Sequence, residues 1–381
     1  METTRQALRD DTSVVVMLYM ALELSGAKWK VAIGDGKRAP SRHTLKAADV
    51  LGLLGVIAKA KKRCGVSGPA RVISCYEAGR DGFWLHRWLL EQGIDNVVVD
   101  SSSIEVNRRA RRAKSDGLDA AKLYEMLMRY VGGETRVWRV VRVPTVEQED
   151  ARRLHRELER LKKERNGHVN RMRSLAVLHN VRLERIGGRG WQQRLEGLQG
   201  RLPPALWQEI ARESRRLELV STQIGALERE RQGQLEAMLE QGGPLAALMQ
   251  LRAIGVQSAW VLVRELFGWR RFGNRRELAG CVGVSPSPYD SGESEHCQGI
   301  SKAGNARVRK LLVEIAWYWL RYQPHSALSQ WFGQRFGGGG KRMRRIGIVA
   351  LARRLLVALW RYLEHGVIPA GAQLKARPAA G

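Results

Sequence analysis

Two aspartates three residues apart, Asp116 and Asp119, are the residues that most clearly suggest chemistry. On a helix, side chains at this spacing share one face, and paired carboxylates give Mg²⁺ the oxygen ligands it prefers while leaving room for phosphate. A cluster of cations that suits phosphates comes just before them: Arg108, Arg109, Arg111, Arg112 and Lys114. The segment indicates metal-assisted chemistry on nucleic acid. The alternative is a helix start whose acids complement the helix dipole.

Further carboxylates are expected at strand ends. Phosphoryl transfer at two metal ions needs acids from separate elements, and α/β sheets place functional groups where strands end. Glu77 follows a predicted strand at 71–76, and Glu23 lies near the end of an apolar strand at 14–24. A charge in an apolar strand is costly unless it is satisfied or used. We therefore take Glu23 and Glu77 as candidate metal ligands, the alternative being solvent-facing strand-end or loop acids.

A third candidate is the serine of a Ser-Gly pair, Ser291, in a Gly/Ser/Pro-rich segment at 280–304. Serine can attack phosphorus when something activates it and neutralises the phosphate. Ordinary turn composition explains the same segment. Cations that could hold nucleic acid follow in two groups after Ser291: Lys302 and Arg307, then Lys341, Arg342, Arg344 and Arg345.

The overall charge favours a polyanionic partner. Among 381 residues, Lys and Arg number 65 against 38 Asp and Glu, for a net charge of +27. DNA or RNA is the simplest partner, and an anionic membrane surface is the rival.

No run approaches the roughly 18 apolar residues of a spanning helix. The polar start is unlike a signal peptide. Four cysteines without a CxxC pair argue against zinc and a disulfide framework, so we expect a cytoplasmic protein.

The pattern of apolar residues predicts an α/β part followed by all-α parts. Strands at 14–24, 28–33, 71–76 and 96–99, with helices at 45–60, 83–92 and 118–130, give a mixed sheet covered by helices. We place this domain at 12–140. Two long helices with leucine seams at 145–242 predict an antiparallel hairpin or a dimerising coiled coil. Shorter helices around the serine segment occupy 244–365, and 366–381 is predicted to be disordered.

These blocks together resemble the DEDD-type transposases of bacterial insertion sequences, relatives of the Piv invertase. The resemblance rests on the order of the segments 114–120, 251–272, 291–292, 300–305 and 311–312. It implies an RNase H/RuvC-like N-terminal domain, a central antiparallel coiled coil and a C-terminal helical transposase domain.

The resemblance also assigns roles to residues. Asp116 and Asp119 match the family's closing pair of acids, and Glu77 matches its second acid. The first is an Asp in the family, where this chain has Glu23, one methylene longer; Asp35 is a lesser alternative. Ser291 matches the nucleophilic serine.

The mechanism that the resemblance implies is cleavage and rejoining of DNA strands through a covalent link from serine to phosphate. Mg²⁺ held by the acids is the expected cofactor. A structured non-coding RNA would guide the protein to DNA, and we expect a homodimer or homotetramer, nucleoid-associated when bound to DNA. Two alternatives stay open: a RuvC-like junction nuclease in which water attacks, and a catalytically degenerate nucleic-acid-binding protein.

Overall fold

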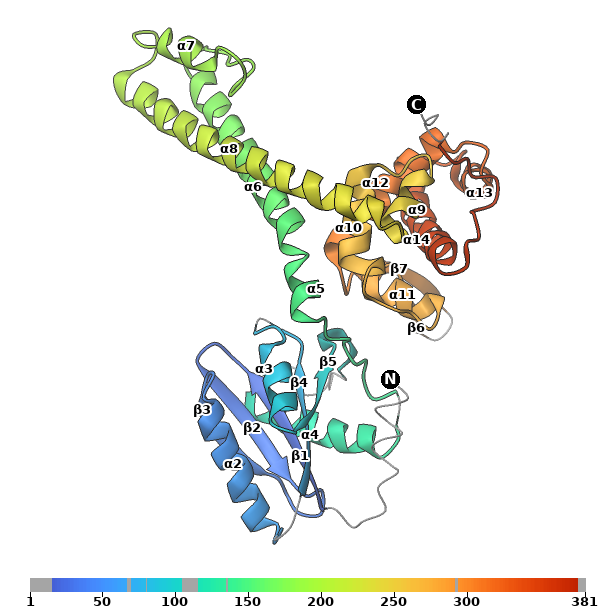
Figure 1. Cartoon of the computed structure of the whole chain (residues 1–381). Helices are drawn as coiled ribbons and strands as arrows, with labels where there is room; N and C mark the ends of the chain where they lie inside the picture. Colours follow the sequence, from blue (N-terminus) through green and yellow to red (C-terminus); the bar gives the residue numbers. More distant parts are fainter. Residues whose placement is uncertain are drawn as a thin grey trace. The chain divides into compact units, whose positions relative to one another are not determined.

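The computed structural model describes residues 16–66, 70–79, 81–104, 116–134, 136–291 and 294–375. The chain divides into two compact units, Met1–Val143 and Pro144–Gly381 (Figure 1). The boundary falls just before Pro144, and the ranges 145–242 and 244–365 belong to the same unit. Each unit is described by itself below.

A five-stranded mixed sheet forms the centre of the first unit, in the order β3-β2-β1-β4-β5. The strands are β1 (Val16–Leu24), β2 (Lys28–Gly34), β3 (Ser41–Lys46), β4 (Ala70–Glu77) and β5 (Asp95–Val99). The first three pair antiparallel, as strands joined by short turns do, and β4 and β5 run parallel to β1. A parallel strand needs a long crossover, and helices provide it here. The predicted mixed α/β sheet is thus confirmed.

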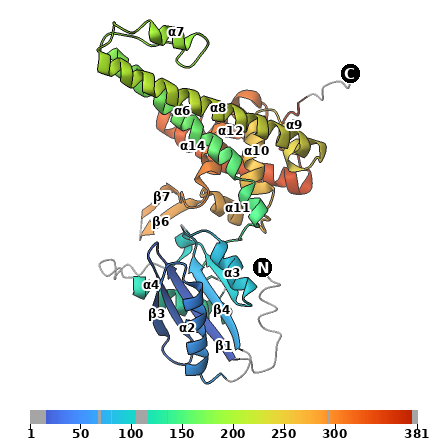
Figure 2. The ribbon, with the colours of Figure 1, turned by 60° about the vertical axis from the view of Figure 1, so that its left-hand side comes forward.

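Helices cover both faces of this sheet (Figure 2). They are α2 (Val50–Arg63), α3 (Trp84–Glu91), the short η1 (Ser101–Ser103) and α4 (Asp116–Val131). Leu18, Met20 and Leu22 of β1 pack in the core with residues of α2 and α3. Ala21, between them, packs on the other face with α4. Alternate β1 residues therefore face different helices, as the period of two in a strand requires.

The edge strand β3 was not predicted from the sequence. The predicted helix at 45–60 begins instead at Val50, where the side chain of Asp49 accepts a hydrogen bond from the Gly52 amide at 2.8 Å. The residues before it form β3, whose side chains are alternately exposed and half-buried. An edge strand of this kind carries few apolar residues, so apolar periodicity does not reveal it.

The second unit is mostly helical. Its elements are α5 (Val146–Asp150), α6 (Arg153–Val177), α7 (Trp191–Glu196), α8 (Pro204–Glu240), α9 (Pro244–Gln250), α10 (Val256–Leu262), the π-helix η3 (Val263–Phe267), α11 (Arg275–Val282), β6 (Pro286–Ser291), β7 (Ser294–Ile300), α12 (Ala306–Tyr322), α13 (Ala327–Phe336) and α14 (Lys341–His365). The helices from α9 onwards share one apolar core, which includes the fully buried Trp260 and Trp319.

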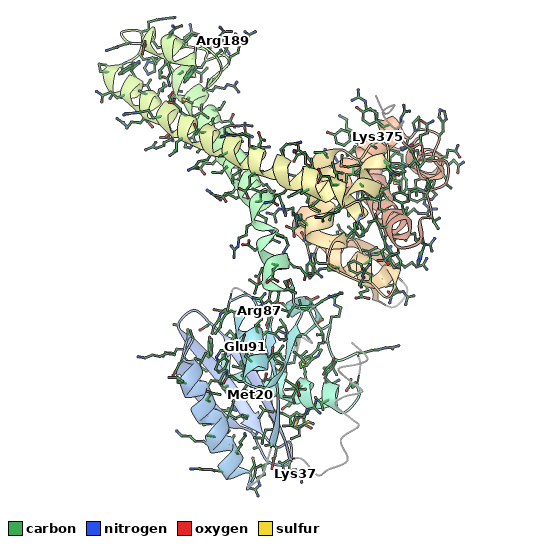
Figure 3. All side chains as sticks on the ribbon, in the orientation of Figure 1. Met20, Lys37, Arg87, Glu91, Arg189 and Lys375 are labelled. Atoms are coloured by element: carbon green, nitrogen blue, oxygen red, sulfur yellow. The ribbon has the colours of Figure 1, made fainter. Side chains whose placement is uncertain are left out.

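The two long helices α6 and α8 pack against each other as an antiparallel hairpin. Lys162 pairs with Glu228, while Arg171, further along α6, pairs with Glu209, nearer the start of α8. The short helix α7 lies at the end of this hairpin, beside the labelled Arg189 (Figure 3). His168 interrupts the leucine seam and hydrogen-bonds through Nδ1 to Oε2 of Glu213 at 2.6 Å. Its polar partner explains why a seam position holds a histidine.

Two segments depart from the loops that the sequence predicts. The range 280–304 contains the antiparallel strands β6 and β7 rather than an open loop. Residues 366–375, predicted to be disordered, are in contact with the helical core: Leu374 pairs with Leu251, and Lys375 Nζ donates to the Ile254 carbonyl at 2.8 Å. These contacts bind 366–375 to the helical core, which an Ala/Gly/Pro composition does not reveal. The remaining residues, 376–381, lie outside the described range.

Candidate functional site

Two of the predicted acids end neighbouring parallel strands. The last registered pair of β1 and β4 is Leu22 with Tyr76, so Glu23 and Glu77 are each the next residue of their strand. Both also fall on the face covered by α4, because Ala21 and Cys75, two positions earlier, pack with that helix. The structure thus brings Glu23 and Glu77 to one edge and one face of the sheet.

Helix α4 brings a third acid to the same edge. The Cys75 thiol donates to the Leu123 carbonyl at 3.7 Å, and Tyr124 Oη accepts from the Gly36 amide at the opposite end of the sheet. Met128, one turn after Tyr124, also lies beside Gly36, with its Sδ 3.2 Å from where a Cβ of that glycine would be, so the helix runs opposite to β1. Asp119, one turn before Leu123, lies about 6 Å closer to the strand ends. Asp116 begins α4, and its side chain lies outside the described residues.

Asp35 does not belong to this group. It follows β2, whose Gly34 pairs with Tyr19, whereas Glu23 pairs with Lys30, four residues or about 13 Å along the sheet. Its carboxylate accepts hydrogen bonds from the amides of Lys37 and Arg38. Burial acts to raise the Asp35 pKa, but these hydrogen bonds outweigh it, and the pKa lies below its ordinary value. Asp35 is a turn residue.

The acids at the strand ends suit Mg²⁺ in type, since carboxylate oxygens are the ligands it prefers. Within the described part of the chain, however, no three His, Cys, Asp or Glu side chains lie close enough together to hold a metal ion. The sheet and α4 therefore bring Glu23, Glu77 and Asp119 to the same edge of the sheet. Their side chains do not form a complete coordination sphere there.

A pocket of about 320 Å³ opens beside Glu77. Its walls come from the ends of β1 and β4 and the loop after β4: Leu24, Ser25, Gly26, Tyr76, Glu77, Gly79, Asp81 and Gly82. The glycines contribute no side chains, which leaves the space open. Asp81 adds a carboxylate to this pocket that the sequence analysis missed, although its position four residues after Glu77 in a glycine-rich loop is a usable signal.

The proposed nucleophile lies on a two-stranded hairpin. Ser291 is the last residue of β6 and pairs with Ser294 of β7; its side chain is outside the described residues. The base of this hairpin is tightly closed: a Cβ at Gly304 would lie 2.2 Å from the Cys281 carbonyl oxygen, and one at Gly283 would lie 1.7 Å from that of Ala303. Both glycines have positive φ. Glycine is therefore required on both sides of the base.

A buried carboxylate that the sequence analysis did not single out is bonded to Asn305, the residue after Gly304. Glu265, in the π-helix η3, accepts hydrogen bonds from Arg156 Nε at 2.7 Å and from Asn305 Nδ2 at 3.0 Å, and His155 Nε2 lies 2.8 Å away. Burial acts to raise the Glu265 pKa, but the hydrogen bonds and charges of Arg156 and His155 hold it well below its usual range. The network joins α6 and η3 to Asn305, the residue that caps α12. A lone acid within the apolar run 260–267 was the available signal.

The predicted phosphate-binding cations have different surroundings. Arg108, Arg109, Arg111, Arg112 and Lys114 lie outside the described residues. Arg307 is held by Glu159 and Glu265, so its charge is already paired. Lys302 is exposed, as are the four cations at the start of α14: Lys341, Arg342, Arg344 and Arg345. Cations in a first helical turn oppose the helix dipole, and an anionic partner would relieve this cost.

None of the helices in the described ranges is long and apolar enough to cross a membrane.

Comparison with known proteins identifies the family. Residues 245–330, from α9 into α13, match the model of the transposase IS116/IS110/IS902 family. The "Putative transposase y4rJ" of Sinorhizobium fredii (strain NBRC 101917 / NGR234) is 43% identical over 97% of this chain and 96% of its own length. The transposase for insertion sequence element IS1111A of Coxiella burnetii is 26% identical over 74% of each chain. The match to the first relative extends over both units, and we conclude that the chain belongs to the IS116/IS110/IS902 family of insertion-sequence transposases.

Proposed function

We propose that this transposase cuts and rejoins DNA strands through a covalent link between Ser291 and phosphate, at a site whose Mg²⁺ is held by Glu23, Glu77, Asp116 and Asp119. The observation that carries the proposal is the common position of Glu23 and Glu77 at the ends of adjacent parallel strands, on the face covered by α4. The direction of α4, which brings Asp119 to the same edge, supports it. The mixed sheet also agrees with the RuvC-like domain that the family resemblance implies.

The acids have a defined task in this scheme. Bound Mg²⁺ would stabilise negative charge on the phosphate that reacts. Glu23, Glu77 and Asp119 come from separate elements, so they can approach a metal ion from different directions. Glu23 stands where the family resemblance implies the shorter Asp, and its carboxylate would reach the metal through one more methylene. The cation-rich segment 108–114 would hold the phosphates that flank the reacting one.

The covalent step conserves phosphodiester bonds. The Oγ of Ser291 attacks phosphorus, a P–Oγ bond forms, a P–O bond to one sugar breaks, and the serine proton ends on the released sugar oxygen. Attack by a sugar hydroxyl on the phosphoserine then reverses these changes, rejoins DNA and frees Ser291. One ester replaces another at each step, so no external energy source is needed. Ser291 is the last residue of β6 in the hairpin β6–β7.

The remaining parts of the proposal concern partners. Family resemblance supports a structured guide RNA, and the net charge of +27 suits binding of DNA and RNA together. The helical hairpin of α6 and α8 is a candidate coiled-coil element for assembly into a dimer or tetramer. A transposase acts where DNA is, so we place it in the bacterial cytoplasm, at the nucleoid.

Trapping of the covalent intermediate tests the proposal. The full-length protein is incubated with Mg²⁺, candidate guide RNA and labelled DNA carrying the element's ends, then denatured. A protein–DNA adduct that survives denaturation and disappears with Ser291→Ala supports the serine mechanism. Cleavage that persists in Ser291→Ala but is lost in Asp119→Asn indicates attack by water and contradicts it. Salt-sensitive binding without any cleavage, under any metal, identifies a degenerate binding protein instead.

A further inference from the structure

Helix α12 carries an exposed stripe of aromatic rings and cations. Trp317, Tyr318 and Tyr322 are 47%, 50% and 47% exposed, although the apolar core is close by and Trp319 between them is fully buried. The exposed positions of the helix recur at three- and four-residue steps, which places them along one face. We define the α12 stripe as Lys310, Glu314, Trp317, Tyr318, Arg321 and Tyr322.

The rings of this stripe present their faces in an ordered way. Tyr318 and Tyr322 have centroids 6.3 Å apart and ring planes inclined by 28°, so they are nearly parallel. The Arg321 guanidinium lies over the Tyr322 ring, 5.3 Å from its centroid. Aromatic faces and guanidinium planes are the groups on which unpaired bases stack. Rings held in register before binding lose little conformational entropy on contact.

The charge of the surface favours nucleic acid over a second copy of the chain. Arg321 contributes a cation to the stripe, Lys310 pairs with Glu314 at 4.0 Å, and the whole chain carries +27. A symmetric dimer centred on Arg321 would bring the guanidinium groups of the two copies together. The stripe also lacks the exposed aliphatic side chains that usually accompany aromatic rings at a homodimer interface. A polyanion with exposed bases satisfies both the rings and the cations.

We propose that the α12 stripe is a stacking surface for unpaired bases of single-stranded DNA. The choice of DNA over RNA rests on the proposed function: α12 begins at Ala306, shortly after β7 ends at Ile300, so the helix that carries the stripe follows the hairpin with Ser291 in the chain. The rings begin about 17 Å along this helix. A strand opened for cleavage and exchange exposes bases near that serine. Stacking on Trp317, Tyr318 and Tyr322 would hold them without regard to sequence, because every base has an aromatic face.

Binding of short labelled oligonucleotides to the full-length protein, in EDTA to prevent cleavage, tests the proposal. The variant Trp317→Ala/Tyr318→Ala/Tyr322→Ala should bind oligothymidine at least about tenfold more weakly, given what one stacked base contributes, and bind duplex DNA almost as before. The matched control, Trp317→Phe/Tyr318→Phe/Tyr322→Phe, keeps the rings and should keep the affinity. Arg321→Ala should reduce the slope of log K against log salt by about 1, and the alanine variant should leave that slope unchanged.

Four outcomes would overturn the proposal. The first is an equal loss of affinity for duplex and single-stranded DNA, and the second is an equal loss of affinity in the phenylalanine control. The third is unchanged oligothymidine binding together with a smaller oligomer in sedimentation, and the fourth is tighter binding of oligouridine than of oligothymidine, with the alanine variant losing affinity for oligouridine alone. The third identifies a protein interface and the fourth an RNA surface. Circular dichroism checks that the variants fold. The serine mechanism has a different readout: Ser291→Ala should remove the covalent adduct and leave oligothymidine binding unchanged. Either proposal can therefore fail without the other.

Discussion

Arg156 and Glu265 form a two-point ion pair across the second unit: Nε and Nη2 of Arg156 lie 2.7 and 2.8 Å from Oε1 and Oε2 of Glu265. The Glu265 side chain has no exposed surface, while that of Arg156 is 42% exposed. A buried carboxylate costs several kcal/mol unless it is fully paired, and here His155 and Asn305 complete the pairing. This pair holds helix α6 against η3, and Asn305 links both to the start of α12.

Removal of the Glu265 carboxylate should therefore destabilise the second unit strongly. Glu265→Ala leaves the buried His155 and the fork of Arg156 without their acceptor, and we expect a loss of about 3–5 kcal/mol. Hydrogen exchange of peptides from α12 in the full-length protein measures it. Glu364→Ala, which removes an exposed partner of Arg271, is the control and should cost at most about 1 kcal/mol. Equal effects of the two variants would refute the role of Glu265.

The same carboxylate should make stability depend on pH. The Glu265 pKa is lower in the folded protein than its ordinary value of 4.5. Its contribution to stability is therefore complete above about pH 5 and is lost as the pH falls below 4.5, when the unfolded chain takes up the proton first. Glu265→Gln cannot titrate, so the difference in unfolding free energy between parent and variant should shrink as the pH falls from 6 to 3. A difference that is constant over this range would contradict the assignment.

The acids at the sheet edge give a prediction about metal-dependent cleavage. Loss of a residue that only supports a metal ligand reduces activity by roughly 10- to 100-fold. Glu77→Ala or Asp119→Asn, which removes a ligand itself, should reduce DNA cleavage by more than this. Glu23→Asp, which restores the family residue, should retain cleavage. Asp35→Ala is the control, because Asp35 lies at the other end of the sheet. Initial rates of cleavage against Mg²⁺ concentration measure these effects, and a defect in Asp35→Ala as large as that in Asp119→Asn would reject the assignment.

The base of the serine hairpin should not tolerate a side chain. Gly304→Ala introduces a Cβ 2.2 Å from the Cys281 carbonyl oxygen in addition to strain at φ +91°. Gly299→Ala is a matched control, with φ +90° and, among the described residues, no atom within 4 Å of the new Cβ. We expect about 1 kcal/mol for the control and at least about 2 kcal/mol more for Gly304→Ala, measured by urea unfolding. Similar losses would show that backbone strain alone, rather than close packing, selects glycine here.

The elements that hold the acids were predictable because their residues carry strong local signals. The apolar runs of β1 and β4 predicted both strands, and the helical periodicity of 118–130 predicted α4. The edge strand β3 escaped because its residues are mostly polar. The strands β6 and β7 escaped because Pro, Ser and Gly are typical of loops. The partners of Glu265 could not be inferred, since Arg156 and Asn305 lie 109 and 40 positions away in the chain and only folding brings them together.

The alternation of β1 has a consequence for how the acidic edge can evolve. Leu22 faces α2 and α3, while Glu23 belongs to the α4 face. A single residue inserted into β1 ahead of Glu23 would reverse this phase, sending a carboxylate toward an apolar core and a leucine toward the acids. An exchange of Asp for Glu leaves the phase intact. Changes in the length of this acid are therefore far less disruptive than changes in the length of the strand that carries it.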